Sequence, residues 1–213
     1  MVRLGIAILI AIAGLAAQPP QASQSELVRQ GQGLMREGKL ADALTAFKQE
    51  LKADSGSMAA LNAAGVTLDL MGKTSEARSY FSKAIEAAPS PQARAAAQRA
   101  MAMSYAFDND CANTVRYEMM VHDYWASQKN FYQQGEMLNE AARVCIEAGQ
   151  FDTAEQLYRS GTEEGLQEPN ITPDRTALWK FRLEHALARL AARRGQKEAA
   201  ETHISAAKAL LKA

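Results

Sequence analysis

A short pattern of residues recurs at a fixed interval between positions 31 and 81. Four residues each return 34 positions later: Gly31 as Gly65, Gly38 as Gly72, Ala43 as Ala77 and Phe47 as Phe81. A fixed period of this length is typical of supersecondary units that stack side by side, because one such unit cannot bury its apolar face alone. The sequence therefore predicts one continuous repeat array and not a closed globule.

Each copy of the pattern predicts two short helices joined at a glycine. Gly38 and Gly72 each follow one apolar-periodic run and precede another, which predicts a left-handed end to the first helix. Gly31 and Gly65 lie inside the helical pattern instead, where glycine costs about 1 kcal/mol relative to alanine. Because this cost recurs at the same place, we expect a neighbouring helix to approach closely there.

At these residues the chain resembles the tetratricopeptide repeat (TPR) family, whose pattern runs from an apolar residue through Leu-Gly and an aromatic to Ala, Phe and Pro. The first copy has Leu27, Gln30-Gly31, Leu34, Ala43 and Phe47, with Ser55 in place of Pro; the second has Leu61, Ala64-Gly65, Leu68, Ala77, Phe81 and Pro89; a later copy has Leu138, Ala141-Ala142, Cys145, Gly149, Ala154 and Tyr158. The resemblance implies an all-α, right-handed α-solenoid of about five TPR-like helix-turn-helix pairs.

The predicted repeat domain spans residues 23–213. Its expected units are about 24–57, 58–91, 92–134, 135–168 and 173–213, and the third and fifth are stretched. Helix starts are indicated by the capping-box spacing of Ser23 and Glu26, by Thr74, by Ser90 before a proline, and by Thr172 before another proline.

The N-terminal residues 1–22 have the features of a secretory signal peptide. Arg3 supplies positive charge, and Leu4 to Ala17 is an apolar run of 14 residues. A membrane span needs about 20 residues, so this run has the length of a signal core. We expect cleavage between residues 16 and 22, export to the periplasm or secreted space, and no membrane contact afterwards. The alternative is an uncleaved N-terminal membrane tether.

Composition and motifs narrow the function. The 24 basic and 24 acidic side chains balance to a formal net charge of zero, which argues against nucleic acid as a partner. The three histidines lack metal-ligand spacing, and we find no phosphate-binding loop or nucleophile motif. The sequence therefore predicts a non-enzyme with no metal and no cofactor, whose partner is another protein or a peptide.

By the same resemblance, the first helices of the pairs present side chains to a concave groove. The groove candidates are Asn62, Asp69, Asn139, Arg143, Arg182, His185, Arg189 and Arg193. The last four recur at i, i+3, i+7 and i+11 and so share one helical face, which could bind a carboxylate or phosphate through guanidinium groups. The alternative is a solvated helix face. The family's clamp for a C-terminal carboxylate is not expected, because Val28 and Gln32 occupy two of its places.

A second candidate surface is an aromatic cluster in the third unit. Its members are Tyr105, Phe107, Tyr117, Tyr124, Trp125, Phe131 and Tyr132, with Met119, Met120 and Met137 among them. Aromatic and methionine-rich surfaces suit adaptable protein binding. The alternative is an irregular repeat whose larger gaps are filled by larger side chains.

The two cysteines, Cys111 and Cys145, leave two alternatives open. An even pair in an exported protein can form a disulfide, and the other outcome is two buried thiols. Cys145 takes the place of Leu34 and Leu68 in the repeat, so we expect it to face inward.

Together these features predict a non-enzymatic protein- or peptide-binding scaffold of the cell envelope or secreted space. The alternative is a structural or accessory subunit of an envelope assembly, held through helix edges.

Overall fold

A computed structural model describes residues 25–211, and over this range the chain forms helices and no strands. The helices are α1 (Glu26–Arg36), α2 (Leu40–Ala53), α3 (Met58–Leu70), α4 (Thr74–Ala87), α5 (Pro91–Phe107), α6 (Cys111–Ser127), α7 (Phe131–Glu147), α8 (Phe151–Leu166), α9 (Pro173–Arg193) and α10 (Lys197–Leu210). The predicted signal peptide, residues 1–22, lies outside the described residues.

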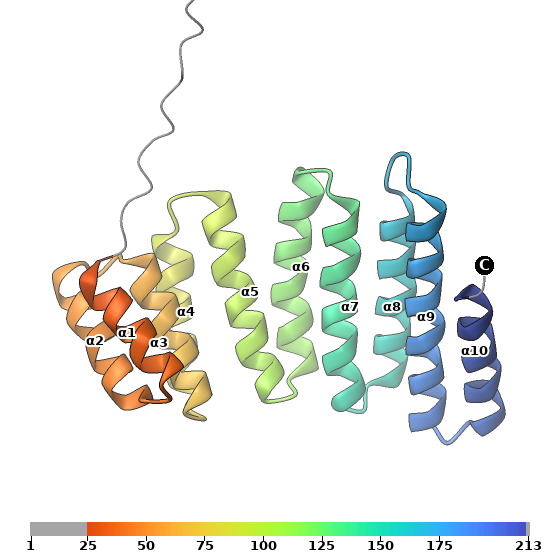
Figure 1. Cartoon of the computed structure of the whole chain (residues 1–213), viewed down its shortest axis with the longest axis horizontal. Helices are drawn as coiled ribbons and strands as arrows, with labels where there is room; N and C mark the ends of the chain where they lie inside the picture. Colours follow the sequence, from red (N-terminus) through yellow and green to blue (C-terminus); the bar gives the residue numbers. More distant parts are fainter. Residues whose placement is uncertain (1–24, 212–213) are drawn as a thin grey trace, which may run out of the picture.

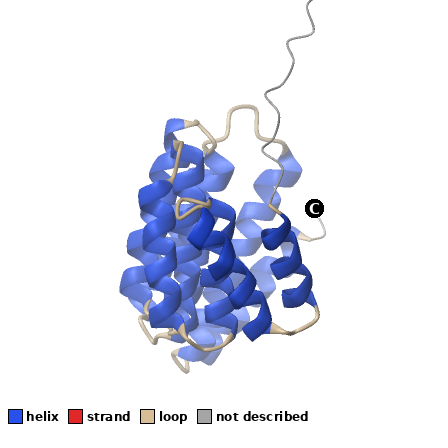
Figure 2. Cartoon of the chain, turned by 90° about the vertical axis from the view of Figure 1, so that its left-hand side faces the viewer, coloured by secondary structure: helices blue, strands red, loops and turns tan. Residues whose placement is uncertain are grey.

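The helices stand in a row in chain order, from α1 at one end to α10 at the other (Figure 1). Every helix packs extensively against the one before it and the one after it. Seen from the α1 end, the chain consists of helices joined by loops, and the more distant helices lie partly behind the nearer ones (Figure 2). This arrangement confirms the predicted fold class, an all-α solenoid of five helix-turn-helix pairs.

The glycine turns inside the pairs have the predicted geometry. Gly38 and Gly72 have φ values of 74° and 73°, in the left-handed region that glycine adopts without steric cost. Beyond the first of them, the Lys39 amide donates to the Leu34 carbonyl at 2.9 Å, which caps a carbonyl at the end of α1. The first helix of each regular pair therefore ends where the sequence predicted.

Two of the predicted helix starts need correction. α1 is capped by Ser25, whose hydroxyl accepts a hydrogen bond from the Val28 amide at 3.2 Å, and Ser23 lies outside the described residues. Thr74 is the first residue of α4 and does not cap it; its hydroxyl donates to Asp108 at 3.0 Å instead. The caps at Ser90 and Thr172 are confirmed, and each precedes a proline in the first turn.

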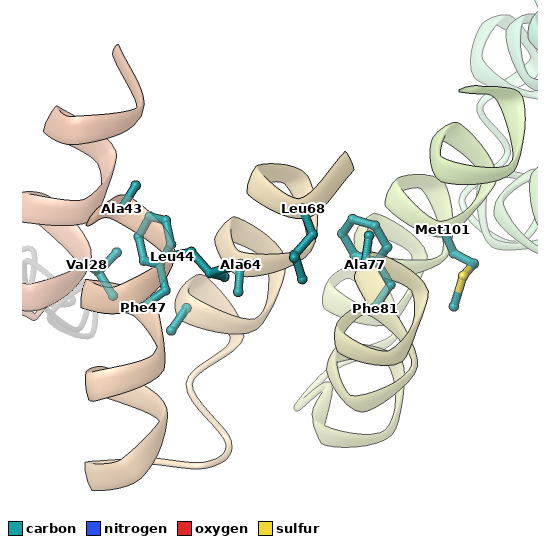
Figure 3. Close-up of a cluster of buried hydrophobic side chains, with 10 residues drawn as sticks. Val28, Ala43, Leu44, Phe47, Ala64, Leu68, Ala77, Phe81 and Met101 are labelled. Atoms are coloured by element: carbon teal, nitrogen blue, oxygen red, sulfur yellow. The ribbon is translucent and has the colours of Figure 1, made fainter. Parts of the chain in front are cut away.

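The repeated glycines and phenylalanines form repeated contacts. Gly31 lies against the ring of Phe47, and Gly65 lies in the same way against Phe81, both rings being fully buried. Figure 3 shows the two phenylalanine rings in the apolar cluster that runs from α1 to α5. Ala43, Ala77 and Ala154 are also fully buried, and Tyr158 is buried at the position that corresponds to the phenylalanines. The missing glycine side chain is what lets each ring approach the first helix.

The helices from α5 to α9 are longer than those of the first two pairs. α5, α6 and α7 have 17 residues each, whereas α1 to α4 have 11 to 14. α7 begins at Phe131, so the fourth pair starts earlier than the expected boundary at residue 135. Among the first helices of the pairs, α3 makes a few direct contacts with α1 and with α5, whereas α7 makes fewer or none with α5 and with α9. The first helices are therefore set further apart in the second half.

Ring contacts divide part of the aromatic cluster of the third unit into separate pairs. Its members form separate pairs: Tyr105 stacks on Tyr117, Tyr124 lies edge-on to Trp125, and Tyr132 lies 5.6 Å from Trp179 of α9. Tyr105 and Tyr117 pack against the apolar cluster of the first half. The cluster is therefore not one continuous stack of rings, and its role as a binding surface stays a prediction.

A disulfide joins Cys111, at the start of α6, to Cys145 on α7. Both residues are buried, and Cys145 is fully inside the core, as expected from its place in the repeat. The bridge ties the second helix of the third pair to the first helix of the fourth.

Candidate functional site

A cavity of about 180 Å³ lies between α7, α8 and α9. Its lining residues are Asn139, Arg143, Tyr158, Phe181, Arg182, His185, Ala186 and Arg189. Five of the eight groove candidates from the sequence line this one cavity, which we call the arginine cavity. α7 and α9 make few direct contacts with each other, so the space between them is where a groove is expected.

α9 owes its position to a buried tryptophan. Trp179 is 1% exposed and lies against the backbone of Gly165, where an added Cβ would come within 2.6 Å of the indole Nε1. Tyr132 packs on the same indole ring. Three residues further on, Arg182 begins the face that lines the cavity, and its guanidinium lies 5.1 Å from the indole centre. The tryptophan thus holds the arginine-bearing face of α9 towards α7.

Arg182 and Arg193 are engaged in close ion pairs. Arg182 donates to Glu136 of α7 at 2.9 Å, and this hydrogen bond raises the pKa of the guanidinium further. Arg193 donates to Glu147 at 2.6 Å and does not line the cavity. These contacts join α9 to α7 along the groove.

Arg143 and Arg189 differ from these because their guanidinium groups are held loosely. Arg143 lies 3.7 Å from Glu140, and Arg189 lies 3.7 Å from Glu147. Their side chains are 49% and 43% exposed, on opposite walls of the arginine cavity. A 3.7 Å separation is too long for a good hydrogen bond, so both groups have donors left for an acidic ligand.

Polar groups of α7 and α8 and an aromatic pair complete the arginine cavity. Asn139 is 4% exposed, and its Oδ1 has no hydrogen-bond partner among residues 25–211. Tyr158 is also buried, and its burial raises the pKa of the phenol. The imidazole of His185 stacks on Phe181 with ring centres 6.2 Å apart. The cavity therefore combines cationic walls with an unsatisfied amide, a combination suited to a carboxylate next to a peptide bond.

Asn62 and Asp69, the two remaining candidates, lie on α3 and belong to another part of the molecule. Asp69 is almost fully buried and accepts a hydrogen bond from Ser104 of α5 at 2.8 Å. Burial raises the pKa of this carboxyl. Because α3 and α5 touch directly, Asp69 joins two repeats and does not line a cavity.

Sequence reasoning missed Glu118, which is 3% exposed on α6. Burial, with the nearby Glu140 carboxylate as a second cause, raises its pKa to about 8. A usable signal was present: Thr114, Glu118 and Val121 follow the i, i+4, i+7 spacing, and all three are buried. Glu118 thus occupies a place where the repeat needs an apolar residue.

Among the helices between residues 25 and 211, none is long and apolar enough to cross a membrane. Within the same range, no three His, Cys, Asp or Glu side chains lie together as metal ligands would.

Comparison with known proteins agrees with the repeat. A family model described as a tetratricopeptide repeat matches residues 59–91, which begin just inside α3 and extend to the start of α5. The match includes Gly65, Ala77 and Phe81, the second copy of the pattern. No curated protein sequence matches the chain.

Solved structures with the same architecture cover most of the chain. The nearly identical TPR-like repeats of a Podosopora anserina protein described as a kinesin light chain give a TM-score of 0.66 at 15% identity, covering 87% of this chain and 93% of that one. The MamA protein gives 0.61 at 15% identity, covering 87% and 90%. YrrB, described as a TPR protein with an unusual peptide-binding site, gives 0.53 at 15% identity, covering 86% and 84%. At these identities the likeness establishes the fold.

Proposed function

We propose that this chain, which has the tetratricopeptide repeat fold, is a non-enzymatic scaffold that binds an acidic segment of another protein in the arginine cavity. The observation that carries the proposal is the pair of half-exposed arginines, Arg143 and Arg189, on facing walls of one cavity. A carboxylate placed between them would gain charge-assisted hydrogen bonds from both sides. The peptide-binding site named for YrrB lends support by analogy of fold.

Asn139 adds a reason to expect a polypeptide. Its buried side-chain oxygen can accept a hydrogen bond from a backbone N–H, and a bound peptide brings such a donor beside its carboxylates. An acidic side chain at the two arginines and a backbone amide at Asn139 would fix both the position and the direction of the segment.

The experiment uses peptide display on the purified protein, followed by fluorescence anisotropy with the selected peptides. We expect the selected sequences to be enriched in Asp and Glu, or to present a free C-terminal carboxylate. The double variant Arg143→Ala/Arg189→Ala should bind them at least about tenfold more weakly, since hydrogen bonds to charged groups are worth roughly 1.5–3 kcal/mol each.

The matched control is Arg94→Ala, which removes a positive charge from an exposed position at the start of α5, outside the arginine cavity. It should bind like the unchanged protein. Equal binding by the double variant, or selection of peptides without acidic groups, would contradict the proposal.

For location, we propose the periplasm or the secreted space. Two features support this: the 14-residue apolar run after Arg3, and the disulfide between Cys111 and Cys145, which persists in oxidising compartments. N-terminal sequencing of the protein from cell fractions tests it. We expect a mature chain that begins between residues 17 and 23. A chain that starts at Met1 in the membrane fraction would support the tether, and one in the cytosol would contradict export.

A further inference from the structure

A second cavity, of about 290 Å³, lies beside the arginine cavity between α5, α6 and α7. Arg143 lines both cavities, so they are neighbours on either side of this one side chain. The walls of the second cavity are partly apolar, with Met103 of α5 and Val144 of α7 among them. Two polar residues of α6, Thr114 and Glu118, also line it.

Thr114 and Glu118 are buried side chains that each carry one polar atom without a hydrogen-bond partner in the described part of the chain. They are one helical turn apart, and only 2% and 3% exposed. The hydroxyl oxygen of Thr114 and the Oε2 atom of Glu118 form no hydrogen bond to any residue between 25 and 211. A buried polar group left unsatisfied costs about 1–3 kcal/mol, so two that face one cavity indicate that a ligand completes them.

The charges around Glu118 limit what that ligand can be. Arg99 of α5 donates to Glu140 of α7 at 2.6 Å, and Arg143 lies 3.7 Å from the same carboxylate. Two guanidinium groups against one carboxylate leave an excess positive charge, which disfavours a cationic ligand. Glu118 is buried beside Glu140, and these two causes raise its pKa to about 8, so its carboxyl is neutral at neutral pH.

A neutral carboxyl presents an O–H donor and a carbonyl acceptor on one edge. The group that complements it is a primary amide, whose carbonyl and one N–H also lie on one edge. In a trans peptide bond the N–H and C=O point in opposite directions, so a backbone amide cannot form both bonds at once. The second N–H of a primary amide remains free to donate to a neighbouring hydroxyl, which Thr114 supplies.

We propose that this cavity, the amide subsite, binds the primary amide of an asparagine or glutamine side chain through the carboxyl of Glu118 and the hydroxyl of Thr114. The inference rests on the proposed function only in assigning that amide to a bound protein segment. Such a segment would place an acidic residue in the arginine cavity and an Asn or Gln in the next cavity along the groove.

The test is an NMR titration of the full chain with four small probes at pH 6: acetamide, N-methylacetamide, acetate and methylammonium. We expect only acetamide to shift the backbone amide signals of Thr114, Glu118 and Val144. Shifts of these signals by N-methylacetamide alone would indicate a backbone-binding site, and shifts by acetate or methylammonium would indicate a charge-binding one. Each of these results, or no shift with any probe, would overturn the proposal.

Variants separate the two side chains. Glu118→Met keeps the length of the side chain and should abolish the acetamide shifts, whereas Glu118→Gln keeps a donor and an acceptor and should retain them. Thr114→Val should weaken acetamide binding about fivefold, the equivalent of one neutral hydrogen bond. Raising the pH above 8 should abolish binding to the unchanged protein but not to Glu118→Gln. Unaltered acetamide binding by Glu118→Met would refute the assignment.

The probe titration needs no peptide, and neither Thr114 nor Glu118 lines the arginine cavity. Loss of the proposed peptide-binding function would therefore leave the acetamide result standing, and failure of the acetamide titration would leave peptide binding at Arg143 and Arg189 untouched.

Discussion

The packing of Gly31 on Phe47 can be tested against another glycine of the same helix. Gly31→Ala would place a Cβ 2.6 Å from Cζ and 2.8 Å from Cδ1 of the Phe47 ring, which is fully buried. Gly33 lies two residues further along α1 and has no atom within 4 Å of the corresponding Cβ position. Both substitutions gain the same helix propensity. The difference between their free energies of unfolding therefore isolates the effect of the collision with the Phe47 ring.

The expected change in the free energy of unfolding is the sum of a gain in helix propensity and a cost of overpacking. Replacing glycine by alanine in a helix interior gains about 1 kcal/mol, which is the whole effect expected for Gly33→Ala. Carbon atoms rest about 3.5–4.0 Å apart, so the Phe47 ring must move by about 1 Å inside a packed core. Overpacking costs about 1–3 kcal/mol. Because the Phe47 ring is fully buried, we expect the cost for Gly31→Ala to lie at the upper end of this range. We therefore expect Gly31→Ala to lower the free energy of unfolding by about 2 kcal/mol net. The free energies of unfolding of the two variants should then differ by about 3 kcal/mol.

The assay is urea unfolding followed by far-ultraviolet circular dichroism, with the free energy of unfolding taken from each curve. Adding Phe47→Leu to Gly31→Ala should restore part of the loss, because the smaller side chain makes room for the Cβ. Gly65→Ala is the interior counterpart and should repeat the destabilisation, since its Cβ would lie 2.7 Å from Cζ of Phe81. If Gly31→Ala proved as stable as Gly33→Ala, the close-packing explanation of the repeated glycines would be refuted.

Three further predictions concern the second half of the solenoid. The Cys111–Cys145 disulfide closes a loop of 34 residues, so its reduction should lower the free energy of unfolding by about 4 kcal/mol. Urea unfolding with and without reductant measures this difference, and the double alanine variant should not respond to reductant. Glu118 has a pKa raised from 4.5 to about 8, so over this pH range the folded state binds a proton that the unfolded state has lost. The free energy of unfolding should therefore fall as pH rises from about 4.5 to about 8. In Glu118→Gln, urea unfolding at the same pH values should show no such fall. Gly165→Ala should destabilise the protein by about 3 kcal/mol in urea unfolding, because its Cβ would collide with the buried Trp179.

The regular repeats could be predicted from the sequence because their determinants are local. Gly31 and Phe47 lie in the two helices of one hairpin, and their 34-residue recurrence marks both the turn and the buried face. Left-handed glycines and prolines at helix starts fix the ends of the helices within a few residues. Thr74 misled the prediction because a helix can begin without a side-chain cap when its first hydroxyl bonds to another repeat.

The site was only half predictable because its determinants come from separate helices. The spacing of Arg182, His185 and Arg189 places them on one face of α9. It does not show that Arg182 is already paired with Glu136, whereas the other two side chains can still contact a ligand. The burial of Trp179 was missed entirely. It depends on glycines of α7 and α8, which leave space for the indole only after three helices have come together.

The groove belongs to the half of the solenoid in which the repeat departs from its period. Nearer the α1 end, α3 touches both α1 and α5 directly, and a polar candidate such as Asp69 is engaged in a hydrogen bond between repeats. In the second half, the first helices are longer and bridge to one another through arginine and glutamate side chains, which leaves cavities between them. Long charged side chains span a gap that alanine and glycine cannot, so the same residues keep the repeats in register and hold the groove open. A ligand that binds Arg189, which lies 3.7 Å from Glu147 of α7, would therefore act on the spacing of α7 and α9 as well as on the surface that it covers.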